Sequence, residues 1–225
     1  MRDTRSIVLV TDAEFRRAED RLTAATRFEC RPAPSGELEL ARAVRDFQVR
    51  YVIVGGRQYA GPLYDALPAG GVIARFGVGY DGIDKARATA ARLLCTNTPG
   101  VLDQSVAEHT MLLIAAASRR LIPALDAMAG DAWNVPAGQD LYGKKLAVIG
   151  CGGIGRAVAR IAAAGYGMSV VGCTRPDAPA PKAIDHFEHV TNDFAAAVRG
   201  ADFVSPTCPR GQRRSHSSTA IGSRC

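Results

Sequence analysis

The chain has 225 residues, a length that predicts one or two domains with a sizeable core. Hydrophobic residues make up 47% and charged residues 22%, as in ordinary globular proteins. No apolar run approaches the roughly 20 residues of a membrane span. We therefore expect no membrane partner and, because no targeting segment is evident, a cytoplasmic protein.

The net charge of +6 is uneven, because residues 203–225 hold four arginines and no acidic residue. A basic tail can attract phosphate without reading a nucleotide sequence. The rest of the chain is nearly neutral, so we expect no nucleic-acid partner. A nucleic-acid binder with a basic tail is kept as a third hypothesis.

Six cysteines form no C-x-x-C pair, and none has a histidine at metal-ligand spacing. Several lie in apparent strands, where a thiol behaves as a small apolar group. We expect reduced, structural cysteines and no metal site. They are Cys30, Cys95, Cys151, Cys173, Cys208 and Cys225.

In residues 1–98, short apolar runs alternate with stretches of helical periodicity. This alternation predicts a doubly wound parallel sheet. The expected strands are residues 7–10, 51–54, 72–76 and 93–96, and the expected helices are 37–47 and 84–92.

Asn97-Thr-Pro-Gly100 interrupts this rhythm, because proline lacks an N–H and disfavours a helix at the preceding residue. We place the boundary between two domains here, with the first domain at residues 1–98 and the second at 99–205. One long helix is expected over residues 103–128.

Gly150-Cys-Gly-Gly-Ile-Gly155 is a G-x-G-x-x-G fingerprint. An apolar run at residues 146–149 precedes it and reads as a buried strand. A helical pattern at residues 156–164 follows, and residues 169–173 form a second expected strand that closes a β-α-β unit.

Each glycine of this motif has a separate purpose. Gly150 permits a tight turn, Gly152 lets the backbone approach a diphosphate, and Gly155 lets the helix pack closely on the strand. The unpaired N–H groups at the start of the helix would face the phosphates. The motif therefore predicts dinucleotide binding, against a merely structural glycine turn.

These segments together resemble the D-isomer-specific 2-hydroxyacid dehydrogenase family. The resemblance extends to Ala201-Asp-Phe-Val204 and rests mainly on four blocks, which are Phe76-Gly-Val-Gly-Tyr-Asp-Gly-Ile-Asp84, Asn97-Thr-Pro-Gly100, Ser105-Val-Ala-Glu-His-Thr110 and Leu141-Tyr-Gly-Lys-Lys-Leu-Ala-Val-Ile-Gly-Cys-Gly-Gly-Ile-Gly155. It implies an α/β protein with a flavodoxin-like substrate domain and a Rossmann domain for NAD(P). It also implies hydride transfer between nicotinamide and C2 of a 2-hydroxy or 2-oxo acid, and a homodimer formed by the helix after Pro99.

By position in the resemblance, the backbone N–H groups of Val78 and Gly79 hold the substrate carboxylate. Glycine fits this purpose, because it lets amides approach an anion closely. Thr110 lies near the nicotinamide, and Gly153-Ile154 touch the diphosphate. Cys208 is a further candidate cofactor contact.

No catalytic residue is assigned within the chain. In the family the acid/base histidine, its glutamate and a carboxylate-binding arginine come later than Cys225. His109 and Glu108 belong to the helix block, and we expect packing or hydrogen-bonding roles for them rather than chemistry.

The cofactor preference depends on the end of the second Rossmann strand. An NAD site has an acid there to bond the ribose 2′-OH, but this position falls on Thr174. Arg175 could pair with the 2′-phosphate of NADP, so we favour NADP. Asp177 could instead restore a preference for NAD, and Arg175 could be a solvated loop charge.

The resemblance stops after Ser205. Residues 206–225 have almost no apolar periodicity and many Arg and Ser residues, so we expect a disordered, aberrant tail. A shifted reading frame from Pro206 permits a family-like continuation, which suggests a frameshift. We expect marginal stability and little turnover, and we keep a non-catalytic dinucleotide-binding module as the alternative.

Overall fold

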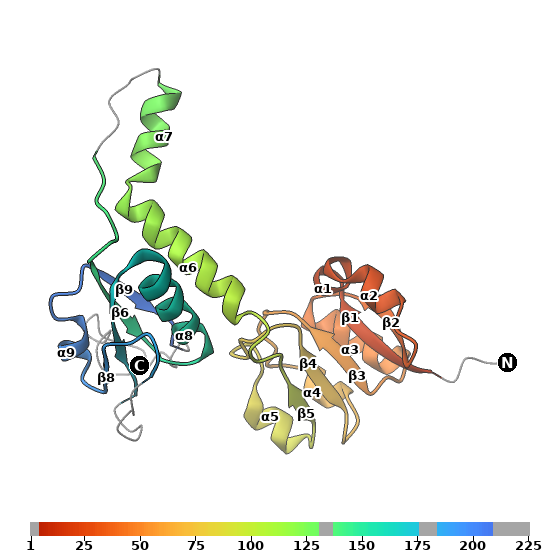
Figure 1. The fold of residues 1–225 in the computed structure, drawn as a ribbon. Coiled ribbons are helices and arrows are strands. Elements are labelled where there is room, and N and C mark those ends of the chain that lie inside the picture. The colour runs from red at the N-terminus through yellow and green to blue at the C-terminus, as the bar shows by residue number, and fades with distance from the viewer. Residues whose placement is uncertain (1–4, 131–136, 176–183, 209–225) are drawn as a thin grey trace. The chain divides into compact units, whose positions relative to one another are not determined.

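The computed structural model describes residues 5–130, 137–175 and 184–208. It divides into two compact units, which meet in sequence between Val101 and Leu102. We call them unit 1 and unit 2, and both are α/β folds built on a parallel sheet (Figure 1).

Unit 1 has a five-stranded sheet in the order β2-β1-β3-β4-β5. This is the flavodoxin-like order, in which the chain reverses its direction of growth between β1 and β3. Its strands are β1 (Ser6–Thr11), β2 (Phe28–Ala33), β3 (Tyr51–Val54), β4 (Val72–Arg75) and β5 (Leu94–Thr96). Its helices are α1 (Asp12–Arg17), α2 (Glu19–Thr23), α3 (Glu37–Asp46), α4 (Leu63–Ala66) and α5 (Lys85–Ala90).

The core of unit 1 follows from the apolar periodicity of these elements. Leu40 and Val44 of α3 lie on one helical face and pack in the same cluster as Leu9 of β1 and Ile73 of β4. All four are essentially buried. The predicted strands and helices of this unit are confirmed, with their ends shifted by a residue or two.

The edge strand β2 and the short helices α1, α2 and α4 were not predicted. β2 contains Pro32 and alternates charged and apolar residues, and only Ala33 of this strand is fully buried. Proline is tolerated on an edge strand because one side of the strand makes no ladder hydrogen bonds.

Unit 2 has a four-stranded sheet in the order β8-β7-β6-β9. This matches strands 3-2-1-4 of a Rossmann sheet. The strands are β6 (Lys145–Ile149), β7 (Ser169–Cys173), β8 (His189–Thr191) and β9 (Phe203–Pro206). The helices are α6 (Asp103–Ser118), α7 (Leu121–Ala129), α8 (Gly153–Arg160), the π-helical turn η1 (Ile161–Gly165) and α9 (Phe194–Val198).

The prediction of one long helix over residues 103–128 is wrong. The helix ends at Ser118, and Arg120 has a φ of +50° before α7 begins. Pro123 explains the break, because a proline ring clashes with the carbonyl four residues earlier and has no N–H to donate. That signal was present in the sequence.

Two other boundaries also differ. The predicted helix 156–164 begins three residues earlier, at Gly153, and its last turn is the π-helical η1. Pro206, expected to begin a disordered tail, is instead the last residue of β9, while residues 209–225 lie outside the described part. Among the described residues, no helix is both long and apolar enough to cross a bilayer.

Candidate functional site: the glycine turn and the loops of unit 1

The glycine turn joins β6 to α8 and is shaped by close backbone contacts. Gly150 has a φ of +107°, and a Cβ added there would lie 2.7 Å from the backbone N of Cys208. Gly155 is buried, and a Cβ added there would collide with the carbonyl oxygen of Gly150. Thr207 closes the turn by donating its hydroxyl to that same oxygen at 2.7 Å. Only glycine fits at both positions.

The middle of this turn is open. Gly152 is exposed, and a Cβ added there would meet nothing within 4 Å. Gly152 is the N-cap of α8, and it makes no side-chain cap hydrogen bond. Since the first N–H groups of an α-helix have no intrahelical partners, they can bind an anion here. The residues present therefore fit a dinucleotide diphosphate.

The end of β7 lies beside the turn, because Gly150 N donates to Cys173 O at 2.8 Å. Thr174 follows as a half-buried residue whose N–H bonds Thr191 O at 2.9 Å. Arg175 is exposed. Three of the predicted cofactor positions, Thr174, Cys208 and the glycine turn, thus meet at one edge of the sheet, whereas Asp177 lies outside the described residues.

Ile154 and Thr110 have more ordinary environments. The half-buried Ile154 side chain packs against the core of unit 2, and its backbone lies in the first turn of α8. The Thr110 hydroxyl donates to Val106 O at 2.7 Å within α6. His109 is exposed and therefore does not pack in the core of unit 2, while exposed Glu108 accepts a hydrogen bond from Gln104 at 2.6 Å.

Cys151, in the glycine turn, is a partly buried thiol. Burial raises the pKa of Cys151 to about 11, and the neighbouring Cys173 adds a smaller contribution. Cys208 packs against the small cluster that contains Ile149. The described cysteines form no disulfide, and no three metal-binding side chains converge anywhere in residues 5–130, 137–175 or 184–208.

In unit 1, Val78 and Gly79 lie on the loop that follows β4. Asn97, just after β5, donates its amide to Val78 O at 2.8 Å, and Thr98 N donates to Gly77 O at 3.1 Å. Gly77 has a φ of +135°, and a Cβ at exposed Gly79 would meet nothing within 4 Å. The loop is therefore pinned from one side and open at Gly79.

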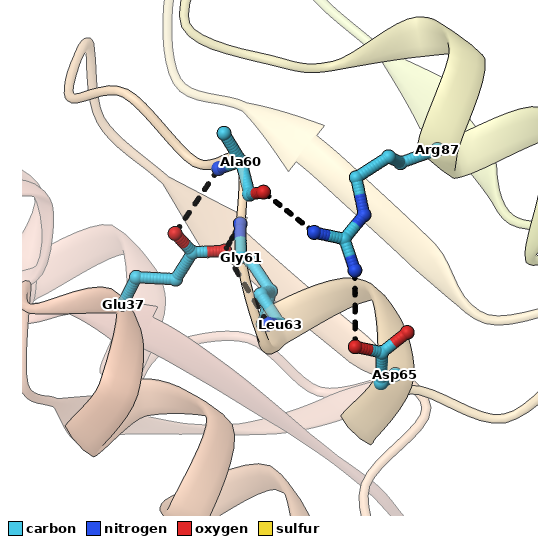
Figure 2. A network of polar contacts seen from close by, with 6 residues as sticks. All are labelled: Glu37, Ala60, Gly61, Leu63, Asp65 and Arg87. Carbon is cyan, nitrogen blue, oxygen red and sulfur yellow. Dashed lines mark hydrogen bonds and ion pairs between the residues drawn. The ribbon is translucent and has the colours of Figure 1, made fainter.

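The neighbouring loop after β3 is held by charged side chains (Figure 2). Glu37, in the first turn of α3, accepts N–H bonds from Ala60 at 3.0 Å, Gly61 at 2.7 Å and Leu63 at 3.3 Å. Arg87 of α5 donates to Ala60 O at 2.6 Å. The sequence did not reveal this network, because its members are distant along the chain.

The same loop is connected to the Val78-Gly79 loop by one bridge. Tyr59 and Ile83 form an isolated β-bridge, and Tyr59 N donates to Gly82 O at 2.8 Å. Arg87 also pairs with Asp65 at 3.0 Å. The contacts of Glu37 and Arg87 therefore help to hold the loop that carries Val78 and Gly79, through this bridge.

Comparisons with known proteins agree with this geometry. Residues 111–220 match the model of the D-isomer specific 2-hydroxyacid dehydrogenase NAD binding domain. A glyoxylate reductase of Thermococcus gammatolerans is 32% identical over 187 residues, which cover 79% of this chain and 54% of that protein. A D-3-phosphoglycerate dehydrogenase of Methanocaldococcus jannaschii is 32% identical over 180 residues, covering 79% of this chain and 34% of that protein.

A solved structure is similar over most of the chain. It is an NADPH-dependent glyoxylate/hydroxypyruvate reductase from Sinorhizobium meliloti in complex with NADP and malonate, with a TM-score of 0.75 and 27% identity. The match covers 93% of this chain and 64% of that one. The chain spans 34% to 54% of the length of the two curated relatives above. Together with the α/β fold and the glycine turn, these matches show that the chain belongs to the D-isomer-specific 2-hydroxyacid dehydrogenase family.

Proposed function

We propose that unit 2 binds the diphosphate of NAD(P) at the opening turn of α8. The observation that carries this proposal is the exposed turn that opens α8 at Gly152, held in shape by Gly150 and Gly155. An anion at this position would be stabilised by the unpaired amides and by the positive end of the helix dipole.

The bound cofactor is proposed to be NADP rather than NAD. Thr174 puts no carboxylate where an NAD site holds the ribose 2′-OH, and exposed Arg175 is available to a 2′-phosphate. The Sinorhizobium meliloti neighbour was solved with NADP, which agrees with this preference. Arg175→Ala should then weaken NADPH binding more than NADH binding, as measured by fluorescence titration of each reduced cofactor.

In unit 1, the substrate carboxylate is proposed to bind the backbone N–H groups of Val78 and Gly79. The open position at Gly79 lets a small anion approach, and the Asn97 contact fixes the loop. The substrate would be a small 2-oxo or 2-hydroxy acid. Glyoxylate and hydroxypyruvate are the compounds to test first, because the names of several relatives specify them.

The proposed activity is that of an NAD(P)-dependent oxidoreductase. The cofactor would supply or accept a hydride at nicotinamide C4, while the chain's own amides bind the diphosphate and the acid. The alternative is a dinucleotide-binding module without turnover. Adding NADPH or NADH with glyoxylate, hydroxypyruvate or phosphohydroxypyruvate separates them, because consumption of the reduced cofactor supports the enzyme, whereas binding alone supports the module.

A homodimer through α6 and α7 is proposed as the assembly. Both helices expose large apolar side chains, which is unusual for a face that remains in water. These residues are Leu112, Leu113, Leu121, Ile122, Leu125 and Met128. Light scattering should give the mass of two chains, and Ile122→Asp should shift the protein to the mass of one.

A further inference from the structure

Asp103, in the first turn of α6, places its carboxylate against the glycine turn. A Cβ added at Gly153 would lie 2.8 Å from the Asp103 carboxyl carbon and 3.3 Å from its Oδ1. Gly153 is the first residue of α8. A half-buried carboxylate therefore stands at the start of the helix that is proposed to bind the diphosphate.

The packing of α6 on α8 holds Asp103 in this place. Ala107 and Met111 of α6 share the core of unit 2 with Val158 of α8. One residue after Asp103, Gln104 accepts a hydrogen bond from Arg160 Nη2 at 2.7 Å, so the two helices are also joined at the end of α8. The backbone position of Asp103 beside the glycine turn is thus set by the packing of α6 on α8.

The charge of Asp103 suits the positive ends of two helices. It lies in the first turn of its own helix, α6, and beside the first turn of α8. Negative groups are stabilised at such positions. Arg156 of α8 donates its Nε to Cys151 O at 3.2 Å, so this cation is bonded to the backbone of the turn.

A dinucleotide diphosphate would need the same positive helix end. Two anions a few ångströms apart repel each other unless a cation or water screens them. Without the cofactor, the Asp103 carboxylate therefore already interacts with the positive end of α8 that would stabilise the diphosphate.

We infer that Asp103 is an affinity-determining residue, a resident carboxylate that opposes binding of the cofactor diphosphate at the start of α8. This inference rests on the proposed dinucleotide site. Its consequence is weaker binding and easier release of the dinucleotide than the glycine turn alone would give.

The first test is titration of NADPH with the full chain at low salt. Asp103→Asn keeps the size of the side chain and removes its charge, so the dissociation constant should fall about tenfold for a half-buried pair of like charges. The gain should shrink in 0.5 M salt because of screening. Asp46→Asn, at an exposed position of α3 in unit 1, makes the same charge change and should leave the dissociation constant unaltered.

The outcomes separate this inference from the proposed function. If neither the wild type nor the variants bind NADPH, the proposed function fails. If the wild type binds and Asp103→Asn binds equally or more weakly, the proposed function stands and the role of Asp103 is wrong. An equal gain in Asp46→Asn would also overturn it, because the effect would then be one of net charge.

A second test needs no cofactor. Gly153→Ala places a methyl group against Asp103, so it should lower the melting temperature of the wild type. In the Asp103→Ser background the methyl group has more room, and the same change should have little effect or raise the melting temperature. Equal shifts in both backgrounds would show that the carboxylate does not lie at the turn in solution.

Discussion

In unit 1 the loop after β3 is held by charged side chains, whereas in unit 2 the turn after β6 is held by glycines and the backbone around them. Glu37 and Arg87 bond the peptide groups of Ala60, Gly61 and Leu63 from outside the loop. Gly150 and Gly155 allow close contacts that a side chain would prevent. Both loops lie at the carboxyl end of a parallel sheet, where ligands bind in α/β folds.

The difference concerns which backbone groups stay available. In unit 1 the Glu37 side chain accepts hydrogen bonds from the amides of the loop, so these amides are not available to a ligand. The loop instead helps to hold the neighbouring loop of Val78 and Gly79. In unit 2 the turn is fixed without a side-chain cap, so the amides at the start of α8 remain available to an anion. We therefore expect added side-chain volume to destabilise the turn of unit 2 and loss of charge to destabilise the loop of unit 1.

The largest effect is expected for Gly155→Ala. The new methyl group would meet the Gly150 carbonyl and come 3.0 Å from Thr207 Oγ1, both in a tightly packed place. Overpacking of this kind costs about 3 kcal/mol. Calorimetry should show a large fall in the melting temperature of unit 2, while Gly165→Ala, which meets nothing within 4 Å, serves as the control. Equal effects would mean that the turn is not held by packing.

A smaller effect is expected for Glu37→Gln in unit 1. The amide keeps one acceptor oxygen but loses the charge that binds three N–H groups, so we expect a loss of about 1–2 kcal/mol in the free energy of unfolding. Glu39→Gln, on an exposed position of the same helix, is the matched control. Urea unfolding measures both, and a loss no greater than that of the control would contradict the role of the network.

The smallest effect concerns Asp202, at the end of the sheet opposite the glycine turn. The backbone N–H of Lys145 lowers the pKa of this carboxyl, and Lys144 adds to the shift. A carboxyl whose pKa is lowered by folding stabilises the folded protein at any pH above the ordinary aspartate pKa near 4. This stabilisation is lost as the pH falls through the lower pKa of the folded state. The stability of Asp202→Asn should therefore vary less between pH 5 and about 3 than that of the wild type. Identical pH profiles would show that the contact is not made in solution.

The sequence was most informative where function requires a local pattern. The glycine spacing predicted the turn because Gly150 and Gly155 each satisfy a backbone requirement that no other residue meets. The parallel strands were also predictable, since buried strands are continuous apolar runs. The edge strand β2 was missed, because it is only partly buried and contains Pro32.

Long-range contacts could not be predicted from local patterns. Glu37 binds amides 23 to 26 residues away, and its role depends on how α3 packs beside the loop. The approach of Asp103 to Gly153 depends likewise on the packing of α6 on α8. Pro123 is different, because a proline within a helical pattern is a local signal, and it indicates the break between α6 and α7 from the sequence alone.

The most direct test of the account is an NADPH titration of Gly152→Ala beside the wild type and Gly165→Ala. The Gly152 methyl group would point into open space, so the fold and melting temperature should not change. It would nevertheless stand where the diphosphate must approach the backbone, so the dissociation constant should rise at least about tenfold. A folded Gly152→Ala variant with the dissociation constant of the wild type would contradict the proposal that this turn holds the cofactor. The absence of NADPH binding by the wild type would contradict it as well.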